Sequence, residues 1–128
     1  MTATLSSKLF VGLTLVVAAF QLALALGAPW GQYAMGGAYP GSFPAPLRLA
    51  ALAQMLVLAL SALVVLSRAG LTLPSWLRAS RWLTWVIAGL FGIGVALNLI
   101  SPSAWERLIW TPIAAGLFLT SIRVALSR

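Results

Sequence analysis

Long apolar runs alternate with short polar breaks along this chain, and the pattern occurs four times. The runs lie at roughly 9–27, 47–67, 82–100 and 108–126, and none contains an acidic residue. Since about 20 residues at 1.5 Å each cross a hydrocarbon core about 30 Å thick, every run is long enough to span a bilayer. We therefore predict an all-α membrane protein. It is an antiparallel four-transmembrane-helix bundle with helices at about 8–27, 47–67, 76–100 and 106–126, in a single domain over 1–128.

The connections between the runs differ in character. Residues 27–46 are rich in glycine, proline and aromatic side chains and carry no charge, so they are expected to fold as a compact cap on the outer membrane face. Gly27 can close the first helix in the left-handed conformation, and Pro29 cannot extend it. Ser75 is a candidate N-cap for the third helix. The short stretch 101–105 makes the third and fourth helices antiparallel neighbours.

The composition excludes a water-soluble domain. Hydrophobic residues make up 62% of the chain and charged residues 7%, with a mean hydropathy of +1.04, whereas soluble domains carry about 25% charge. A net charge of +7 would suggest nucleic-acid binding if the basic residues clustered. They lie instead singly or in pairs at the ends of apolar runs, so no nucleic-acid partner is expected.

Lysine and arginine predict the orientation in the membrane. The side that holds both termini carries six basic residues: Lys8, Arg68, Arg78, Arg81, Arg123 and Arg128. The other side carries Arg48 and Arg107. This distribution predicts both termini in the cytoplasm. The apolar stretch 9–26 is longer than the core of a typical signal peptide, so we expect a retained helix.

Catalysis has few candidate groups. The chain has no cysteine, no histidine and one acidic residue, Glu106. General acid–base catalysis usually needs a histidine or two tuned carboxylates, and metal sites need ligands that this chain lacks. We expect no enzyme activity, no metal and no cofactor.

The polar side chains within the spans gather in the outer half. They are Gln21, Gln54 and Asn98, with Arg48, Glu106 and Arg107 at the outer helix ends. The inner half offers hydroxyl groups only, such as those of Thr14, Ser61, Thr84 and Thr120. Because a polar group that faces lipid is costly, the outer polar set is expected to point inward and to converge.

This set has two interpretations. It can line a ligand pocket under the cap, or its amides can simply hold helices together. Glu106 could carry a proton or bind a cation, or it could cap the fourth helix and pair with Arg48 or Arg107. The two arginines could hold a lipid phosphate or act as interfacial anchors.

Aromatic and small residues add two further candidates. The six tryptophans lie near span ends, as in an aromatic belt, although Trp30 and Trp110 could also form pocket walls. In the third helix, Gly89, Gly92 and Gly94 would let a neighbouring helix approach closely.

Four motifs carry a resemblance. They are Gly27-Ala28-Pro29-Trp30-Gly31, Gly36-Gly37, Trp105-Glu106-Arg107 and Trp110-Thr111-Pro112. Over essentially its whole length the chain resembles a type of small bacterial membrane protein with four spans. The resemblance implies the bacterial cytoplasmic (inner) membrane and no particular activity. The chain is also similar in size to small multidrug exporters, but its first span lacks the acidic residue that they use.

Three functional hypotheses follow. The first is a non-enzymatic protein that binds a lipid or small apolar molecule in the outer half of the bundle. Its site residues would be Gln21, Trp30, Arg48, Gln54, Asn98, Glu106, Arg107 and Trp110. The second is a structural or accessory subunit that self-associates or binds another membrane protein through the third helix. The third is a small oligomeric transporter or channel.

Overall fold

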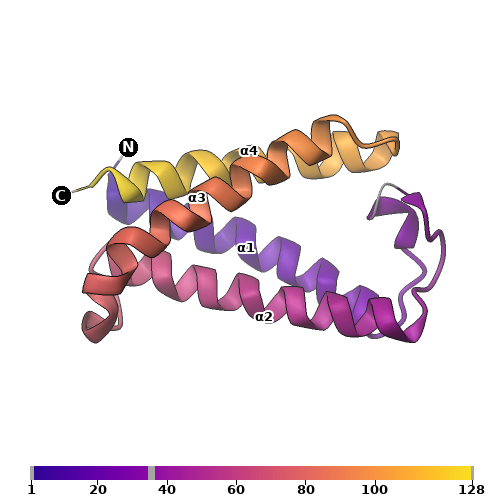
Figure 1. The fold of residues 1–128 in the computed structure, drawn as a ribbon, viewed down its shortest axis with the longest axis horizontal. Coiled ribbons are helices and arrows are strands. Elements are labelled where there is room, and N and C mark those ends of the chain that lie inside the picture. The colour runs from indigo at the N-terminus through magenta and orange to yellow at the C-terminus, as the bar shows by residue number, and fades with distance from the viewer. Residues whose placement is uncertain (1, 35–36, 128) are drawn as a thin grey trace.

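Four long helices make up most of the chain (Figure 1). The computed structural model describes residues 2–34 and 37–127. The helices are α1 (Ala3–Ala25), α2 (Ala45–Arg68), α3 (Leu77–Leu99) and α4 (Ala104–Ala125), with short 3-10 helices η1 (Gly31–Tyr33) and η3 (Pro74–Trp76). All four long helices have the length and apolar composition needed to cross a membrane. The predicted fold class is therefore confirmed.

The helices form an antiparallel bundle in which each packs against its neighbours in the chain, and α1 packs against α4. The two termini and the 69–76 connection lie at one end, which we call the termini end (Figure 1). Residues 26–34 and 37–44, which we call the cap, and residues 100–103 lie at the opposite end, the cap end. The predicted antiparallel contact between the third and fourth helices is present.

The ends of α1 show how local chemistry sets the helix limits. The helix begins at Ala3, earlier than the predicted residue 8, because the Thr2 hydroxyl accepts a 3.1 Å hydrogen bond from the backbone N–H of Leu5. At the other end Gly27 has φ 99°, and its N–H bonds to the carbonyl of Leu24 at 3.1 Å. The prediction that Gly27 closes this helix is confirmed.

The start of α3 differs from the prediction. Ser75 does not cap the helix, since it lies inside η3 and the residue before α3 is Trp76, which makes no side-chain capping bond. The preceding turn is fixed elsewhere: Leu73 is left-handed at φ 48°, and its carbonyl accepts a 3.0 Å hydrogen bond from the Ser67 hydroxyl. This bond ties the turn to the end of α2 and leaves the Ser75 hydroxyl outside the helix cap.

The main core lies toward the termini end. Its buried apolar residues are Phe10, Val64, Val65, Ile87, Leu117 and Val124. All four helices also bury small hydroxyl side chains here: Ser6, Ser7, Thr14, Ser61, Ser67, Ser80, Thr84, Thr120 and Ser121. Several donate to carbonyls of their own helix, as Thr84 does to Ser80 at 2.6 Å. Small side chains let the helices approach closely at this end, although the buried hydroxyls of Ser6 and Thr14 have no hydrogen-bond partner among the described residues.

Packing loosens along α3 toward the cap end. Its buried residues, Ser80, Thr84, Ile87 and Ala88, all precede Gly89. Spaced by three and four positions, Ile87, Phe91, Gly94 and Asn98 continue one face of the helix. Phe91 still reaches the core, with its ring 5.5 Å from that of Phe10, but a Cβ added at Gly94 would meet no atom within 4 Å. The α1–α2 and α3–α4 pairs diverge toward this end (Figure 1).

Candidate functional site at the cap end

The cap is bound to α4 by three contacts. The indole Nε1 of Trp110 donates a 2.7 Å hydrogen bond to the carbonyl oxygen of Tyr33. The Ser103 hydroxyl donates to the carbonyl oxygen of Gln32 at 3.1 Å. The rings of Tyr33 and Trp105 meet edge to face at 6.1 Å. Two carbonyls of η1 are thus satisfied by the side chains of Trp110 in α4 and of Ser103, the N-cap residue of α4, as a folded cap requires.

Aromatic rings connect the cap with α1 as well. The ring of Phe20 in α1 lies 4.6 Å from that of Trp110 and 6.5 Å from that of Trp30, which it stacks against. Leu24 of α1 and Phe43 of the cap are buried in a second, smaller cluster with Ala51 of α2. The cap therefore joins α1, α2 and α4 rather than lying on them as a loose loop.

Glycine permits a close approach inside the cap. The N–H of Gly31 bonds to the carbonyl of Gly41 at 2.9 Å, and a Cβ at Gly31 would lie 1.8 Å from the carbonyl oxygen of Tyr39. No other residue fits there without a backbone shift. The expected compact cap is present over its described residues. Met35 and Gly36 lie outside them, so only Gly37 of the Gly36-Gly37 motif is described.

Glu106 takes part in the start of α4. The backbone N–H of Glu106 donates to the hydroxyl of Ser103, the N-cap residue, at 3.3 Å. Its carboxylate accepts a 3.1 Å hydrogen bond from the Ser101 hydroxyl, which in turn accepts from the N–H of Ser103 at 3.2 Å. The motif Ser103-Ala-Trp-Glu106 is a capping box whose return bond runs through Ser101. This motif was the sequence signal for the local structure, and the prediction from sequence overlooked it.

The two arginines of this end bind backbone carbonyls. Arg48 donates through Nε to the carbonyl of Ala25 at 2.8 Å, in the last turn of α1. Arg107 donates through Nη1 to the carbonyl of Ser101. A cation is favourable at a helix C-terminus, where carbonyls lack partners. Glu106 and Arg107 thus both bond to Ser101, the first to its hydroxyl and the second to its carbonyl, whereas Arg48 bonds to the end of α1, so the three do not share one partner.

The three amides do not converge either. Gln54 is exposed on the outside of α2, so the expectation that it points inward is wrong. Asn98 is partly buried, and its Nδ2 donates to the carbonyl of Gly94 in its own helix at 2.9 Å. Gln21 is partly buried in α1. Because α2 is apolar over most of its surface, its sequence has no polar stripe that would fix which face is inward.

The glycines of α3 meet different surroundings. A Cβ at Gly92 would lie 3.0 Å from the Phe118 ring of α4, so this glycine does serve helix packing. Gly89 is exposed, and beyond the adjacent residues and the backbone of α3 itself, a Cβ built at Gly89 or Gly94 would meet no atom within 4 Å. The expected packing role therefore applies to Gly92 within one chain and not to the other two.

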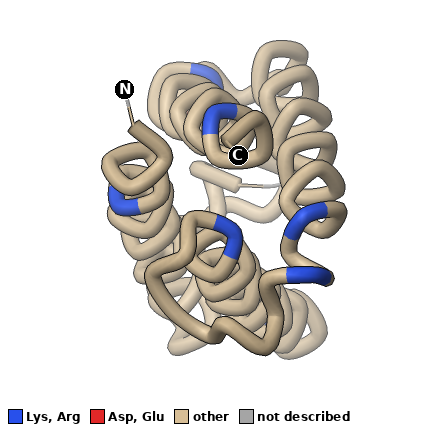
Figure 2. The backbone as a smooth tube through the Cα atoms, turned by 90° about the vertical axis from the view of Figure 1, so that its left-hand side faces the viewer, with Lys and Arg blue, Asp and Glu red and all other residues tan. Residues whose placement is uncertain are grey.

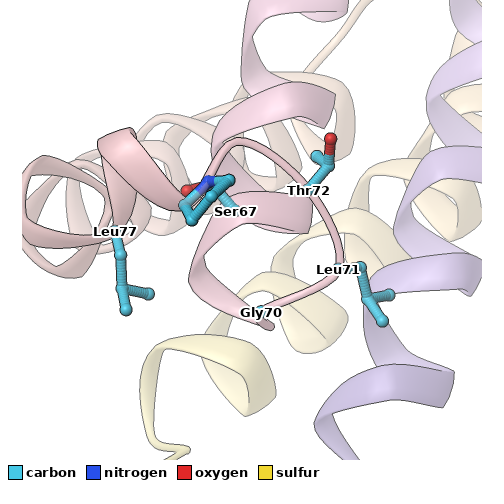
Figure 3. A pocket seen from close by; sticks show the side chains of 6 residues that line it. Ser67, Gly70, Leu71, Thr72 and Leu77 are labelled. Carbon is cyan, nitrogen blue, oxygen red and sulfur yellow. The ribbon is translucent and has the colours of Figure 1, made fainter.

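Two surface hollows lie at the termini end, away from the predicted ligand site. One, of about 280 Å³, is lined by Ser67, Gly70, Leu71, Thr72, Pro74 and Leu77 (Figure 3). The second, of about 350 Å³, is lined by Pro74, Ser75, Leu77, Arg78 and Arg81. The sequence singled out Arg78 and Arg81 only as topology signals.

Comparison of the chain with protein-family models, with curated proteins and with solved structures found no match in any of the three.

Proposed function

We propose that this chain is a non-enzymatic integral membrane protein that binds a lipid acyl chain or another small apolar molecule at the cap end, against the inward face of α3. The observation that supports this is the loss of close packing along that face toward the cap end. It is buried at Thr84 and Ile87, reaches the core at Phe91, and has nothing within 4 Å of a Cβ built at Gly94. An apolar surface without close neighbours inside a membrane bundle is suited to an apolar guest.

The chemistry of this face favours an apolar ligand. Asn98 is its polar member, and the Nδ2 of Asn98 already bonds to the Gly94 carbonyl. The other groups that this face presents to the bundle are the Phe91 ring and the backbone surface at Gly94. Such a surface binds by van der Waals contact and apolar burial rather than by hydrogen bonds.

The role of the other candidate residues changes accordingly. Trp30, Trp110 and Glu106 support the cap and the start of α4, and in this proposal they hold the roof of the site. Arg48 and Arg107 each use one guanidinium nitrogen in the contacts described above. A guanidinium has five N–H donors, so the remaining ones could bind the polar head of a lipid. Gln54 is left out, because it lies on the outer surface of α2.

The test is native mass spectrometry of the protein extracted with its own membrane lipids. Gly94→Leu would fill the open space, and Gly12→Leu is the matched control because Gly12 is an exposed helical glycine that also has nothing within 4 Å. We expect wild type and Gly12→Leu to retain an added mass of a few hundred daltons or more, and Gly94→Leu to lose it. Equal retention by all three, or retention by none, would refute the proposed site.

We also propose that the protein lies in a bacterial inner membrane with both termini in the cytoplasm. Support comes from the distribution of charge: Lys8, Arg68, Arg78, Arg81 and Arg123 lie toward the termini end, and Arg48 and Arg107 toward the cap end. A C-terminal alkaline phosphatase fusion should be inactive and a C-terminal green fluorescent protein fusion bright. The reverse result would overturn the orientation.

A further inference from the structure

Basic residues surround the termini end, and the acidic residue of the chain lies elsewhere. Figure 2 shows blue segments, which mark lysine and arginine, around this end. By their positions in the helices they include Lys8, Arg68, Arg78, Arg81 and Arg123. Glu106 opens α4 at the cap end. No carboxylate side chain is therefore close enough to neutralise these cations. A surface of this kind attracts anions, but charge alone does not make a binding site.

Arg78 and Arg81 differ from the other basic residues of this end. Arg68 donates through Nη2 to the carbonyl of Ser127, and Arg123 also has an interaction partner. Neither Arg78 nor Arg81 forms a hydrogen bond or ion pair with the residues that the structure describes. They lie three positions apart in the first turns of α3, on neighbouring parts of one helix face. Both line the same hollow, of about 350 Å³.

The turn before α3 shapes the other wall of this hollow. The left-handed Leu73 and its bond from Ser67 place Pro74 and Ser75 beside the two arginines. Since Ser75 makes no capping bond, its hydroxyl can donate to a ligand in the hollow. η3 runs directly into α3, with the Leu77 N–H bonded to the Pro74 carbonyl, so the positive end of their shared dipole lies at Pro74 and Ser75 and raises the local potential for an anion.

Tryptophans place the hollow at the level of the lipid headgroups. Trp76, Trp82 and Trp85 are exposed and lie within four residues of Arg78 or Arg81. Exposed tryptophans at the end of an apolar span favour the membrane–water interface. The hollow therefore lies at the same depth as the lipid headgroups, so a headgroup can enter it from the surrounding bilayer.

From these observations we propose that Arg78, Arg81 and Ser75 bind a phosphate group, and that in the membrane this group belongs to an anionic phospholipid. Guanidinium groups pair with phosphate oxygens through two parallel N–H bonds, and two of them on one face can enclose a phosphodiester from both sides. The site is separate from the apolar face of α3 at the opposite end, so the two proposals can fail independently.

The experiment uses the full chain in nanodiscs of equimolar phosphatidylglycerol and phosphatidylcholine, with bound lipids counted by native mass spectrometry. The test variant is Arg78→Gln with Arg81→Gln. Its matched control is Lys8→Gln with Arg123→Gln, which removes the same charge from the same end. We expect wild type and control to prefer phosphatidylglycerol and the test variant to lose this preference by about thirtyfold, because it alone loses the charge-assisted hydrogen bonds to the phosphate. The helical circular dichroism spectrum of each variant confirms that it is folded.

Two outcomes would overturn the proposal. Equal losses in the test variant and the control would mean a diffuse attraction to negative lipid, and an unchanged test variant would mean that the hollow is not the site.

A competition arm with inorganic phosphate distinguishes the sources of the anion. Failure of millimolar phosphate to displace the lipid supports a headgroup site. Full displacement overturns the lipid assignment in favour of a soluble phosphate ligand. Gly94→Leu should leave the phosphatidylglycerol preference unchanged.

Discussion

Trp110 in α4 and Tyr33 in η1 are joined by a 2.7 Å hydrogen bond from the indole Nε1 to the backbone carbonyl oxygen. The same indole packs against Phe20 of α1, with ring centres 4.6 Å apart. One side chain therefore bonds the cap to α4 and also packs α4 against α1. The cap is part of the bundle's tertiary structure and should respond when either contact is removed.

Trp110→Phe removes one of these two contacts and keeps the other. Phenylalanine keeps an aromatic ring near Phe20 but has no N–H for the Tyr33 carbonyl. We expect the free energy of unfolding, measured by SDS titration in mixed micelles, to fall by about 1 kcal/mol. Trp105→Phe is the control, because Trp105 meets Tyr33 through its ring alone. An equal effect of both substitutions would show that the hydrogen bond contributes nothing of its own.

Gly31→Ala should destabilise the cap much more than the addition of a single methyl group usually does. Its Cβ would lie 1.8 Å from the Tyr39 carbonyl oxygen, so the cap backbone must move, at a cost of about 3 kcal/mol. Gly41→Ala, in the same loop, meets no atom within 4 Å and bears only the strain of φ +85°, about 1 kcal/mol. Limited chymotrypsin digestion should cleave the cap of Gly31→Ala fastest. Equal digestion of the two variants would contradict the predicted clash.

Arg48→Gln should weaken the junction of α1 and α2. It removes the Nε bond to the Ala25 carbonyl and the cation at the C-terminus of α1. Since Arg48 is exposed and screened by water and headgroups, we expect a loss of about 1 kcal/mol in the SDS titration. Arg78→Gln is the control, because the Arg78 guanidinium forms no hydrogen bond or ion pair with the described residues, and it should leave the stability unchanged. A larger loss for Arg78→Gln would contradict its assignment as a group free for a ligand.

Gln54→Leu should not destabilise the bundle. Gln54 lies nine positions into α2, about 14 Å along the helix, and is exposed on its lipid-facing side. Replacing an amide that faces hydrocarbon should leave the free energy of unfolding unchanged or raise it by about 1 kcal/mol. Leu58→Ala, one turn further at a buried position, should lower it by about 3 kcal/mol in the same assay. A loss in Gln54→Leu would reveal a partner for the amide.

Hydrophobic periodicity was sufficient to predict the spans, and turn chemistry to predict some of their ends. The four runs appear as four helices, and Gly27 ends the first with a positive φ as expected. These features depend on local sequence: length, apolar content and the conformational freedom of one glycine. They could be predicted because they do not depend on contacts with residues that are distant in the sequence.

The contacts of the candidate site depend on distant residues, and sequence reasoning predicted fewer of them. Arg48 reaches a carbonyl 23 positions back, and Ser103 reaches one 71 positions back. For Gln54, the expected inward orientation came from the cost of a polar group in lipid, but α2 has apolar side chains on every face and its rotation is set by packing. Ser75 failed as a helix cap because the Ser67–Leu73 bond fixed the turn differently.

The separation of 77 positions between Tyr33 and Trp110 also sets an order of assembly. During synthesis the cap leaves the ribosome before α2, α3 and α4, so the carbonyls of Gln32 and Tyr33 stay in contact with water while the second and third helices enter the bilayer. Their partners, Ser103 and Trp110, arrive only with the last helix. Insertion of α4 therefore completes the bundle and the anchoring of the cap in the same step, and a nascent chain stalled before residue 103 would hold the cap through its contacts with α1 and α2 alone.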